Sequence, residues 1–170
     1  MSVNQQDNVR IVALGSDHGG YPAKEVLKAY LEMHGYVVRD VGTFSSESVD
    51  YPDFALKVAT AVAGGSADRG IMIDGAGIGS SMVCNKVRGI RAALCYNDKT
   101  IVNSREHNNA NVLTLGGPLH SPEELCSMAR LWLETRFAGG RHWRRINKMM
   151  AAERIGARIS PAAGGPGDAQ

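Results

Sequence analysis

The strongest constraint on the fold is a regular alternation of short apolar segments with segments of helical spacing. Five apolar segments, each ended by glycine or polar residues, occupy about residues 9–15, 36–42, 69–74, 90–96 and 111–117. A helical pattern follows each of them. Such alternation is typical of a parallel sheet whose connecting helices cover both faces.

The helical segments begin and end at residues that commonly bound helices. In the first, Val26 and Leu27 belong to an apolar stripe, and Gly35 is a suitable stop. The fifth has Ser121 as N-cap and Glu124 three residues later, which together form a capping box. The predicted helices are about 21–35, 51–65, 78–87, 98–107, 121–137 and 142–156. The predicted fold class is therefore α/β, a Rossmann-like three-layer αβα arrangement with a five-stranded parallel sheet and a C-terminal helix.

Composition places the chain among ordinary globular proteins. Of 170 residues, 44% are hydrophobic and 21% are charged, which suits one folded domain. We expect that domain to span 9–158, between disordered tails at 1–8 and 159–170. A net charge of +2 argues against general nucleic-acid binding, and no apolar run approaches the ~20 residues of a membrane span. The three scattered cysteines are expected to be buried thiols in a cytoplasmic protein.

The loops that follow the strands are the places to look for function, because open parallel sheets bind ligands at the carboxyl ends of their strands. The most distinctive loop is DGAGIGSS, residues 74–81. It has three interpretations: a dinucleotide-phosphate loop, a plain turn in which Asp74 caps the next helix, or a nest of N–H groups that holds an oxyanion beside Asp74, which then acts as a catalytic base. The GxGxG spacing does not match a dinucleotide fingerprint, and the loop follows the third strand rather than the first.

Other loops carry polar residues with both structural and functional interpretations. Asp17 and His18 directly follow the first strand, and His107 and Asn108 precede the fifth. Each pair is common in turns, and Tyr51 is equally suited to start a helix. The C-terminal segment GGRHWRR contains Arg141 and Arg145, alongside His142 and Arg144. Its basic residues fit a solvated helix face, but two arginines at i, i+4 also point toward one anion.

The ordered set of segments resembles one family. GSDHGGYPAK, VGTFSSESVDYPDFA, GIMIDGAGIGSSMVCNKVRGIRAAL, SREHNNANVLTLGG and GGRHWRR together resemble ribose-5-phosphate isomerase B and the galactose-6-phosphate isomerase subunits over about residues 9–155. The resemblance implies aldose–ketose isomerisation of a sugar phosphate, most simply ribose 5-phosphate, through an enediolate and with no cofactor or metal. It also implies a homodimer with shared active sites, often paired into tetramers.

The resemblance implies the following roles. Asp74 would be the base and His107 would assist ring opening by acid–base transfer. The remaining residues would bind substrate: Asp17, His18, Tyr51, the backbone of Gly75, Ala76, Gly77, Gly79 and Ser80, then Asn108, Arg141 and Arg145. The loop backbone would hold the enediolate, and the arginines, with His18, the phosphate. In the family, the histidine–asparagine and arginine elements come from the partner chain.

Four positions depart from the family pattern. Many members have a cysteine base where this chain has Asp74, and others have a glutamate at the position of Ser80; one type of galactose-6-phosphate isomerase subunit has aspartate at the first position. Pro118 stands where a phosphate-binding arginine is common, and Ala76 where a hydroxyl is common. These departures leave open a tetrose or hexose phosphate substrate. Two alternatives from other classes also remain: a non-catalytic sugar-phosphate-binding homologue and a nucleotide-binding module.

Overall fold

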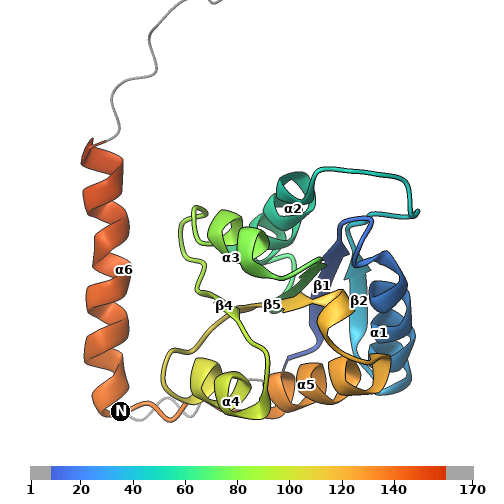
Figure 1. The fold of residues 1–170 in the computed structure, drawn as a ribbon. Helices are drawn as coiled ribbons and strands as arrows, with labels where there is room; N and C mark the ends of the chain where they lie inside the picture. Colours follow the sequence, from blue (N-terminus) through green and yellow to red (C-terminus); the bar gives the residue numbers. More distant parts are fainter. Residues whose placement is uncertain (1–8, 160–170) are drawn as a thin grey trace, which may run out of the picture.

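A computed structural model describes residues 9–159. The expected tail at 1–8 lies outside the described residues, as does the tail expected at 159–170 except for its first residue, Ile159, which belongs to a helix. Five parallel strands form one sheet in the order β2-β1-β3-β5-β4 (Figure 1). They are β1 (Ile11–Ser16), β2 (Val37–Asp40), β3 (Arg69–Asp74), β4 (Ala92–Leu94) and β5 (Val112–Gly116). The predicted α/β class is confirmed, and the third strand has the predicted bounds. The fourth is much shorter than the predicted 90–96, because its regular pairing with β5 covers only Ala92–Leu94.

Helices cover both faces of the sheet. Helices α1 (Tyr21–Met33), α4 (Asp98–Glu106) and α5 (Pro122–Glu134) pack together on one face, and α2 (Tyr51–Ala63) packs with α3 (Ile78–Cys84) on the other. A short 3₁₀ turn, η1 (Gly117–Leu119), joins β5 to α5. The capping box of Ser121 and Glu124 is present. Gly35, two residues after the end of α1, has a φ of 85°, a value that favours glycine.

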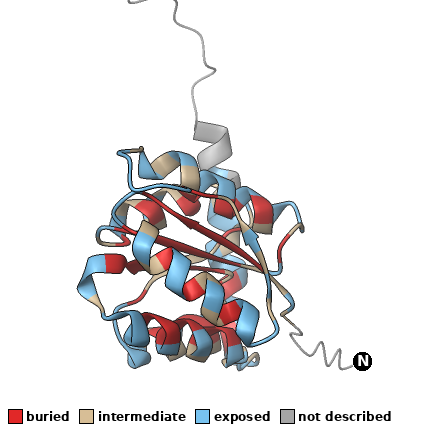
Figure 2. Cartoon of the chain, turned by 90° about the vertical axis from the view of Figure 1, so that its right-hand side faces the viewer, coloured by how far each residue is buried: buried red, intermediate tan, exposed pale blue. Residues whose placement is uncertain are grey.

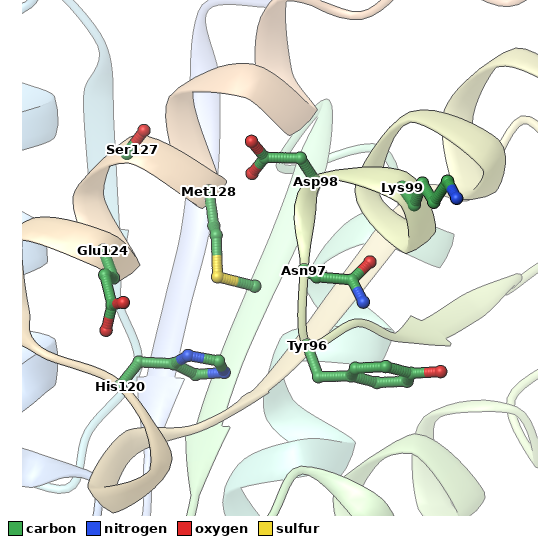
Figure 3. Close-up of a pocket in the computed structure, with 8 residues that line it drawn as sticks. All are labelled: Tyr96, Asn97, Asp98, Lys99, His120, Glu124, Ser127 and Met128. Atoms are coloured by element: carbon green, nitrogen blue, oxygen red, sulfur yellow. The ribbon is translucent and has the colours of Figure 1, made fainter.

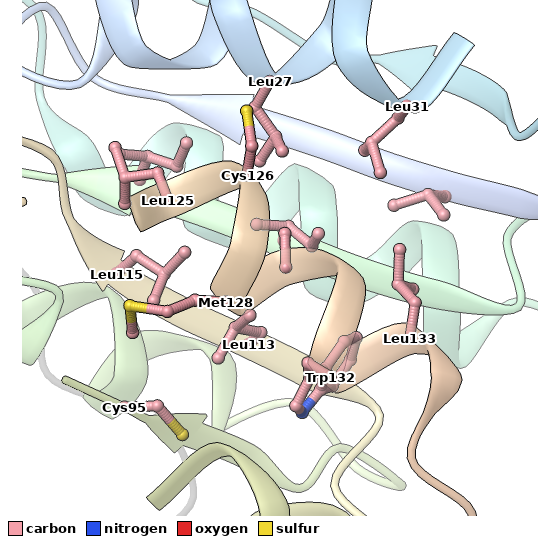
Figure 4. Packing of buried hydrophobic residues seen from close by; sticks show 14 of the residues in the cluster. Leu27, Leu31, Cys95, Leu113, Leu115, Leu125, Cys126, Met128, Trp132 and Leu133 are labelled. Atoms are coloured by element: carbon pink, nitrogen blue, oxygen red, sulfur yellow. The ribbon is translucent and has the colours of Figure 1, made fainter. Parts of the chain in front are cut away.

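The core consists of two apolar layers, one on each side of the sheet. Buried residues follow the strands and the inner helix faces (Figure 2). Leucines of α1, β5 and α5 belong to one buried cluster with Trp132 (Figure 4). Trp132 is fully buried, and its Nε1 donates to the Ser104 hydroxyl at 3.1 Å. Leu27 of α1 is buried as expected, and so is Leu31, but Val26 is 44% exposed, because the helix turns that position away from the sheet.

Helix α6 (Arg141–Ile159) stands beside the sheet layers (Figure 1). It begins one residue before and ends three residues after the predicted 142–156. Two of its contacts are with the segment after α3: Glu153 accepts from the Gly89 N–H at 2.9 Å, and Arg91 reaches the Met150 sulfur at 3.6 Å. Met149 is 45% exposed. None of the helices within residues 9–159 is both long and apolar enough to cross a membrane.

Candidate active site

Three loops meet along the carboxyl-terminal end of the sheet, where β1, β3 and β5 end; this end of the sheet is called the Asp74 edge. Strand β3 pairs with both of the others, so their carboxyl ends are neighbours. The helices that follow β1 and β3 pack on opposite faces. This is the topological position at which open α/β sheets bind ligands. The loops are also in close contact: a Cβ on Gly20 would lie 2.2 Å from the Ile73 carbonyl oxygen, so only glycine fits there.

Asp74 ends the central strand and is the best-connected polar side chain of this edge. It is 5% exposed. Its Oδ1 accepts hydrogen bonds from the N–H of Ala76 at 2.8 Å and from the N–H of Gly77. Its Oδ2 accepts from the N–H of Ser80 at 3.2 Å and from the Ser80 hydroxyl. The loop and the first turn of α3 therefore close around the Asp74 carboxylate.

This arrangement corrects one detail of the expected site. The loop N–H groups were predicted to face a bound oxygen, with Asp74 beside them. Those of Ala76, Gly77 and Ser80 instead donate to Asp74 itself. The N–H groups of Ile78 and Gly79 belong to the first turn of α3, where a helix offers them no acceptor of its own. An oxyanion bound here would meet these two groups or displace the carboxylate.

Asp17, His18 and Tyr51 surround the same edge. Asp17 is 8% exposed and its Oδ1 accepts from the Gly20 N–H at 2.9 Å, which holds the start of α1. The His18 Nδ1 lies 3.2 Å from the Val49 carbonyl oxygen, so the imidazole is tied to the loop before α2. The Tyr51 ring covers Gly79, where a Cβ would lie 2.6 Å from the phenol oxygen. The structure therefore brings these three side chains together with the Asp74 loop.

A buried ion pair supports the loop that leads to Tyr51. Lys24 is fully buried, and its ammonium lies 2.6 Å from an oxygen of Asp40, at the end of β2. Burial by itself would raise the pKa of Asp40, but hydrogen bonds from Lys24, the Gly42 N–H and Lys28 outweigh it and lower that pKa. Thus Lys24, a residue type that is rarely buried, supports this part of the sheet through its ion pair with Asp40.

The remaining predicted residues lie at the other end of the sheet. Helix α4 starts at the carboxyl end of β4 and runs back toward the amino end of β5, so His107 and Asn108 are far from Asp74 within one chain. Arg141 and Arg145 begin α6, and the chain before them is attached to the end of α4, where the Ala138 N–H donates to the Glu106 carbonyl at 3.0 Å. One chain therefore presents two separate groups of predicted residues.

The turn that displays His107 is held by a buried guanidinium. Arg105 is 1% exposed. It donates to the Ala110 carbonyl at 2.6 Å and to the Asn109 side-chain oxygen at 2.8 Å. Asn109 has a φ of 46°, a left-handed conformation that asparagine tolerates better than most residues. These contacts fix the backbone on either side of Asn108.

Two residues at this end were not predicted as site residues. His142 stacks on His107, with ring centroids 4.3 Å apart and planes 8° from parallel. Burial lowers the pKa of His142, and the positive charges of His107, Arg141 and Arg145 lower it further, against an opposing effect of Glu106. Asn103 lies one helical turn before His107 and contacts its Nδ1 at 2.8 Å. The i, i+4 spacing of Asn103 was the available sequence signal.

A surface cavity of about 500 Å³ lies between the β4–α4 and β5–α5 connections (Figure 3). The His120 ring and the Met128 side chain point into it, and the His120 Nε2 is buried with no partner among the described residues. Its lining residues are Tyr96, Asn97, Asp98, Lys99, His120, Glu124, Ser127 and Met128. None of the predicted site residues is among them, so the cavity is separate from the Asp74 loop.

Comparisons with known proteins agree on one family. The model of the ribose/galactose isomerase family matches residues 12–149. Ribose-5-phosphate isomerase B of Escherichia coli is 42% identical over 142 residues, which cover 84% of this chain and 95% of that protein. The structure of Clostridium thermocellum ribose-5-phosphate isomerase B has a TM-score of 0.84 and 48% identity, over 85% of this chain and 98% of that one. The Mycoplasma genitalium ribose-5-phosphate isomerase B, with bound ribulose-5-phosphate, has a TM-score of 0.81 and 38% identity, over 85% and 96%.

Proposed function

Because the chain belongs to the ribose/galactose isomerase family, a family of aldose–ketose isomerases, we propose that it interconverts ribose 5-phosphate and ribulose 5-phosphate through an enediolate. The observation that supports this most is the near full-length similarity to proteins named for that reaction. By itself, the similarity supports the broader assignment of a sugar phosphate isomerase. The choice of a five-carbon sugar is part of the proposal.

Asp74 is the proposed base. It ends the central strand, where the loops of β1, β3 and β5 converge. In the forward direction, the carboxylate takes the proton from C2 of the open-chain aldose, which gives the enediolate with its charge on O1. The O2 hydroxyl proton then passes to O1, and the Asp74 carboxyl returns its proton to C1, which leaves the carbonyl at C2 and a hydroxyl at C1. The negative charge that develops on the sugar oxygen between these steps is met by the N–H groups of Ile78 and Gly79. Asp74 must release at least one of its loop donors to reach the substrate, and the Ser80 hydroxyl is the donor that rotates most freely.

Substrate orientation is assigned to the side chains around this edge and to a second chain. Asp17 and Tyr51 flank the sugar, and His18 contributes to phosphate binding. The two arginines of α6, Arg141 and Arg145, lie at i, i+4, a spacing that directs both guanidinium groups toward one phosphate. Binding energy from the phosphate then holds the reacting carbons in place.

A homodimer would complete the site. His107, Asn108 and the α6 arginines lie at the end of the sheet opposite Asp74, so they cannot act on the same substrate within one chain. In a two-fold symmetric pair, each chain's second group meets the partner's Asp74 edge, and two equivalent sites form. Helix α6 stands beside the sheet layers, which suits a segment that reaches a neighbouring chain (Figure 1).

Mixing two inactive variants tests this proposal. Asp74→Asn and His107→Ala should each abolish most ribose 5-phosphate isomerisation. When the two variants are unfolded together and refolded, about a quarter of the natural activity should return, because half of the random dimers are mixed and each has one intact site. No recovery, with mixed dimers present by native mass spectrometry, would place all catalytic groups within one chain and overturn the shared site.

A second candidate function has one specific observation in its favour. The Asp74 carboxylate is fully engaged by loop donors, as expected of an anchoring residue in a protein that binds a sugar phosphate without converting it. A panel of tetrose, pentose and hexose phosphates separates the candidates. Turnover of ribose 5-phosphate supports the isomerase, whereas thermal stabilisation by a panel member without turnover supports the binding protein. Preferred turnover of a tetrose or hexose phosphate would move the assignment to that sugar.

A further inference from the structure

The end of α4 contains a chain of side-chain amides that leads to His107. The Asn108 side-chain Nδ2 lies 3.2 Å from the backbone carbonyl oxygen of Asn103. A carbonyl oxygen only accepts, so the atom of Asn108 that contacts it must be the NH₂ group. The same carbonyl also accepts the His107 N–H at 3.1 Å as part of the helix, so its position is fixed by the backbone. This contact therefore settles which way the Asn108 amide points.

The orientation of Asn108 determines that of Asn103. The Asn108 NH₂ lies 3.1 Å from the Asn103 side-chain oxygen, which must accept. The other end of the Asn103 amide is then its NH₂, and this group lies 2.8 Å from the His107 Nδ1. An NH₂ group donates, so Nδ1 accepts through its lone pair. In neutral His107 the ring proton is consequently on Nε2.

The stacked ring of His142 limits how His107 can turn. The two imidazoles are nearly parallel at 4.3 Å, and His142 is itself 8% exposed. His142 therefore covers one face of the His107 ring, while the Asn103 amide holds one edge. The charged groups near the pair are Glu106 of α4 and Arg141 and Arg145 of α6. The nitrogen left for a ligand is Nε2, on the edge that Asn103 does not occupy.

We propose that Asn103 is a positioning residue that holds His107 in its Nε2–H tautomer, so that His107 donates a hydrogen bond to a sugar oxygen. The proposal rests on the proposed function for the identity of the acceptor, which would be the ring oxygen of the cyclic sugar phosphate. The opposite tautomer would present a lone pair to that oxygen and repel it. Asn103 touches no substrate in this arrangement and acts only through His107.

The test inverts the tautomer with one near-isosteric change. In Asn103→Asp, a carboxylate replaces the NH₂ donor, so Nδ1 must donate and the neutral ring proton moves off Nε2. In Asn103→Leu, the ring loses its partner and both tautomers become available. Asn103 is exposed, so both variants should fold, and thermal unfolding checks this. The full-length protein is labelled with ¹⁵N-histidine, and His107→Gln identifies the His107 signals among the five histidines.

The direct readout is the protonation of each ring nitrogen in ¹⁵N NMR, measured about two pH units above the usual histidine value of about 6.5. We expect the proton on Nε2 in the natural protein and on Nδ1 in Asn103→Asp. The kcat/KM for ribose 5-phosphate should fall about 100-fold in Asn103→Asp, as for removal of one catalytic hydrogen-bond donor, and about 10-fold in Asn103→Leu.

The outcomes separate this inference from the proposed function. A proton on Nδ1 in the natural protein overturns the inference, whatever the activity. An inverted tautomer with unchanged kcat/KM overturns the positioning role of Asn103. If the natural protein converts no aldose phosphate but shows the proton on Nε2, the proposed function fails and the tautomer assignment stands.

Discussion

Asp74→Asn is the most informative single change in this protein, because the structure gives Asp74 an anchoring role and the proposed mechanism gives it a catalytic one. The loop directs three N–H groups and one hydroxyl at the carboxylate. An asparagine amide has only one oxygen to accept them. Whichever way the amide is turned, its NH₂ group faces at least one N–H, so a donor loses its acceptor in a buried place.

The expected loss of stability follows from the number of hydrogen bonds that the asparagine weakens or cannot make. With the amide oxygen toward Ala76 and Gly77, the two hydrogen bonds there lose their charge assistance, and the buried Ser80 N–H is left unsatisfied. An unsatisfied buried group costs about 1–3 kcal/mol, and the weakened bonds add to it, so we expect the free energy of unfolding to fall by about 3 kcal/mol. For a domain of this size, that corresponds to a decrease of roughly 6–12 °C in Tm.

The catalytic effect is measured separately on the same sample. Loss of the proposed base should lower kcat for ribose 5-phosphate by about 10²–10⁴-fold, when the assay temperature is well below the Tm of the variant. Asp74→Cys restores a group that accepts a proton but accepts hydrogen bonds poorly, so part of the activity should return while Tm remains low. Ser81→Ala, on the same short helix and outside the Asp74 hydrogen bonds, serves as the matched control for Tm.

Two results would contradict this prediction: one would refute the anchoring role of Asp74 and the other its catalytic role. A variant whose Tm matches that of the natural protein would show that the loop does not depend on the carboxylate. A variant with reduced Tm and full kcat would leave Asp74 as an anchor only and move the base elsewhere.

Four further predictions concern an ion pair, a carboxyl group, a buried thiol and a phosphate-binding arginine. Lys24→Met removes one partner of a buried ion pair and should lower the free energy of unfolding by on the order of 3 kcal/mol in urea titrations; an equally stable variant would mean that Lys28 suffices for Asp40. The pKa of Asp40 is lowered in the folded state, so its ionised carboxylate contributes fully to the free energy of unfolding above the unfolded pKa of about 3.9. That contribution is lost as the pH falls through the folded pKa, so the stability loss in an acid titration should be smaller in Asp40→Asn. Cys84 is fully buried, and burial together with the nearby negative charge of Asp74 raises its pKa to about 12, so iodoacetamide should modify it at pH 8 only after unfolding, and rapid native labelling would contradict this burial. Arg145→Leu should lower kcat/KM for ribose 5-phosphate by about 10–100-fold, the value of one charge-assisted hydrogen bond, with Arg144→Leu as the neighbouring control.

Local sequence signals were sufficient for the secondary structure and the order of the elements. The apolar run at 69–74 predicted β3 at both ends, and Ser121 with Glu124 predicted the start of α5. Such signals work because caps, helical spacing and buried strands depend on residues that are close in the chain. Resemblance added the candidate residues, which no spacing rule could have selected from ordinary turns.

The tertiary structure decided the contacts between residues that are distant in sequence. Val26 has helical spacing and is exposed, while Lys24 is buried because Asp40 lies across from it on a neighbouring strand. The separation of His107 from Asp74 depends on where α4 ends relative to the sheet. The stacking of His142 on His107 joins two helices. These features arise from packing in three dimensions, and a single sequence contains no local pattern that encodes them. The sequence alone therefore determined the α/β architecture and its strand-end loops. The folded chain decided which polar groups meet, which donors hydrogen-bond to Asp74 and at which end of the sheet each group of candidate residues lies.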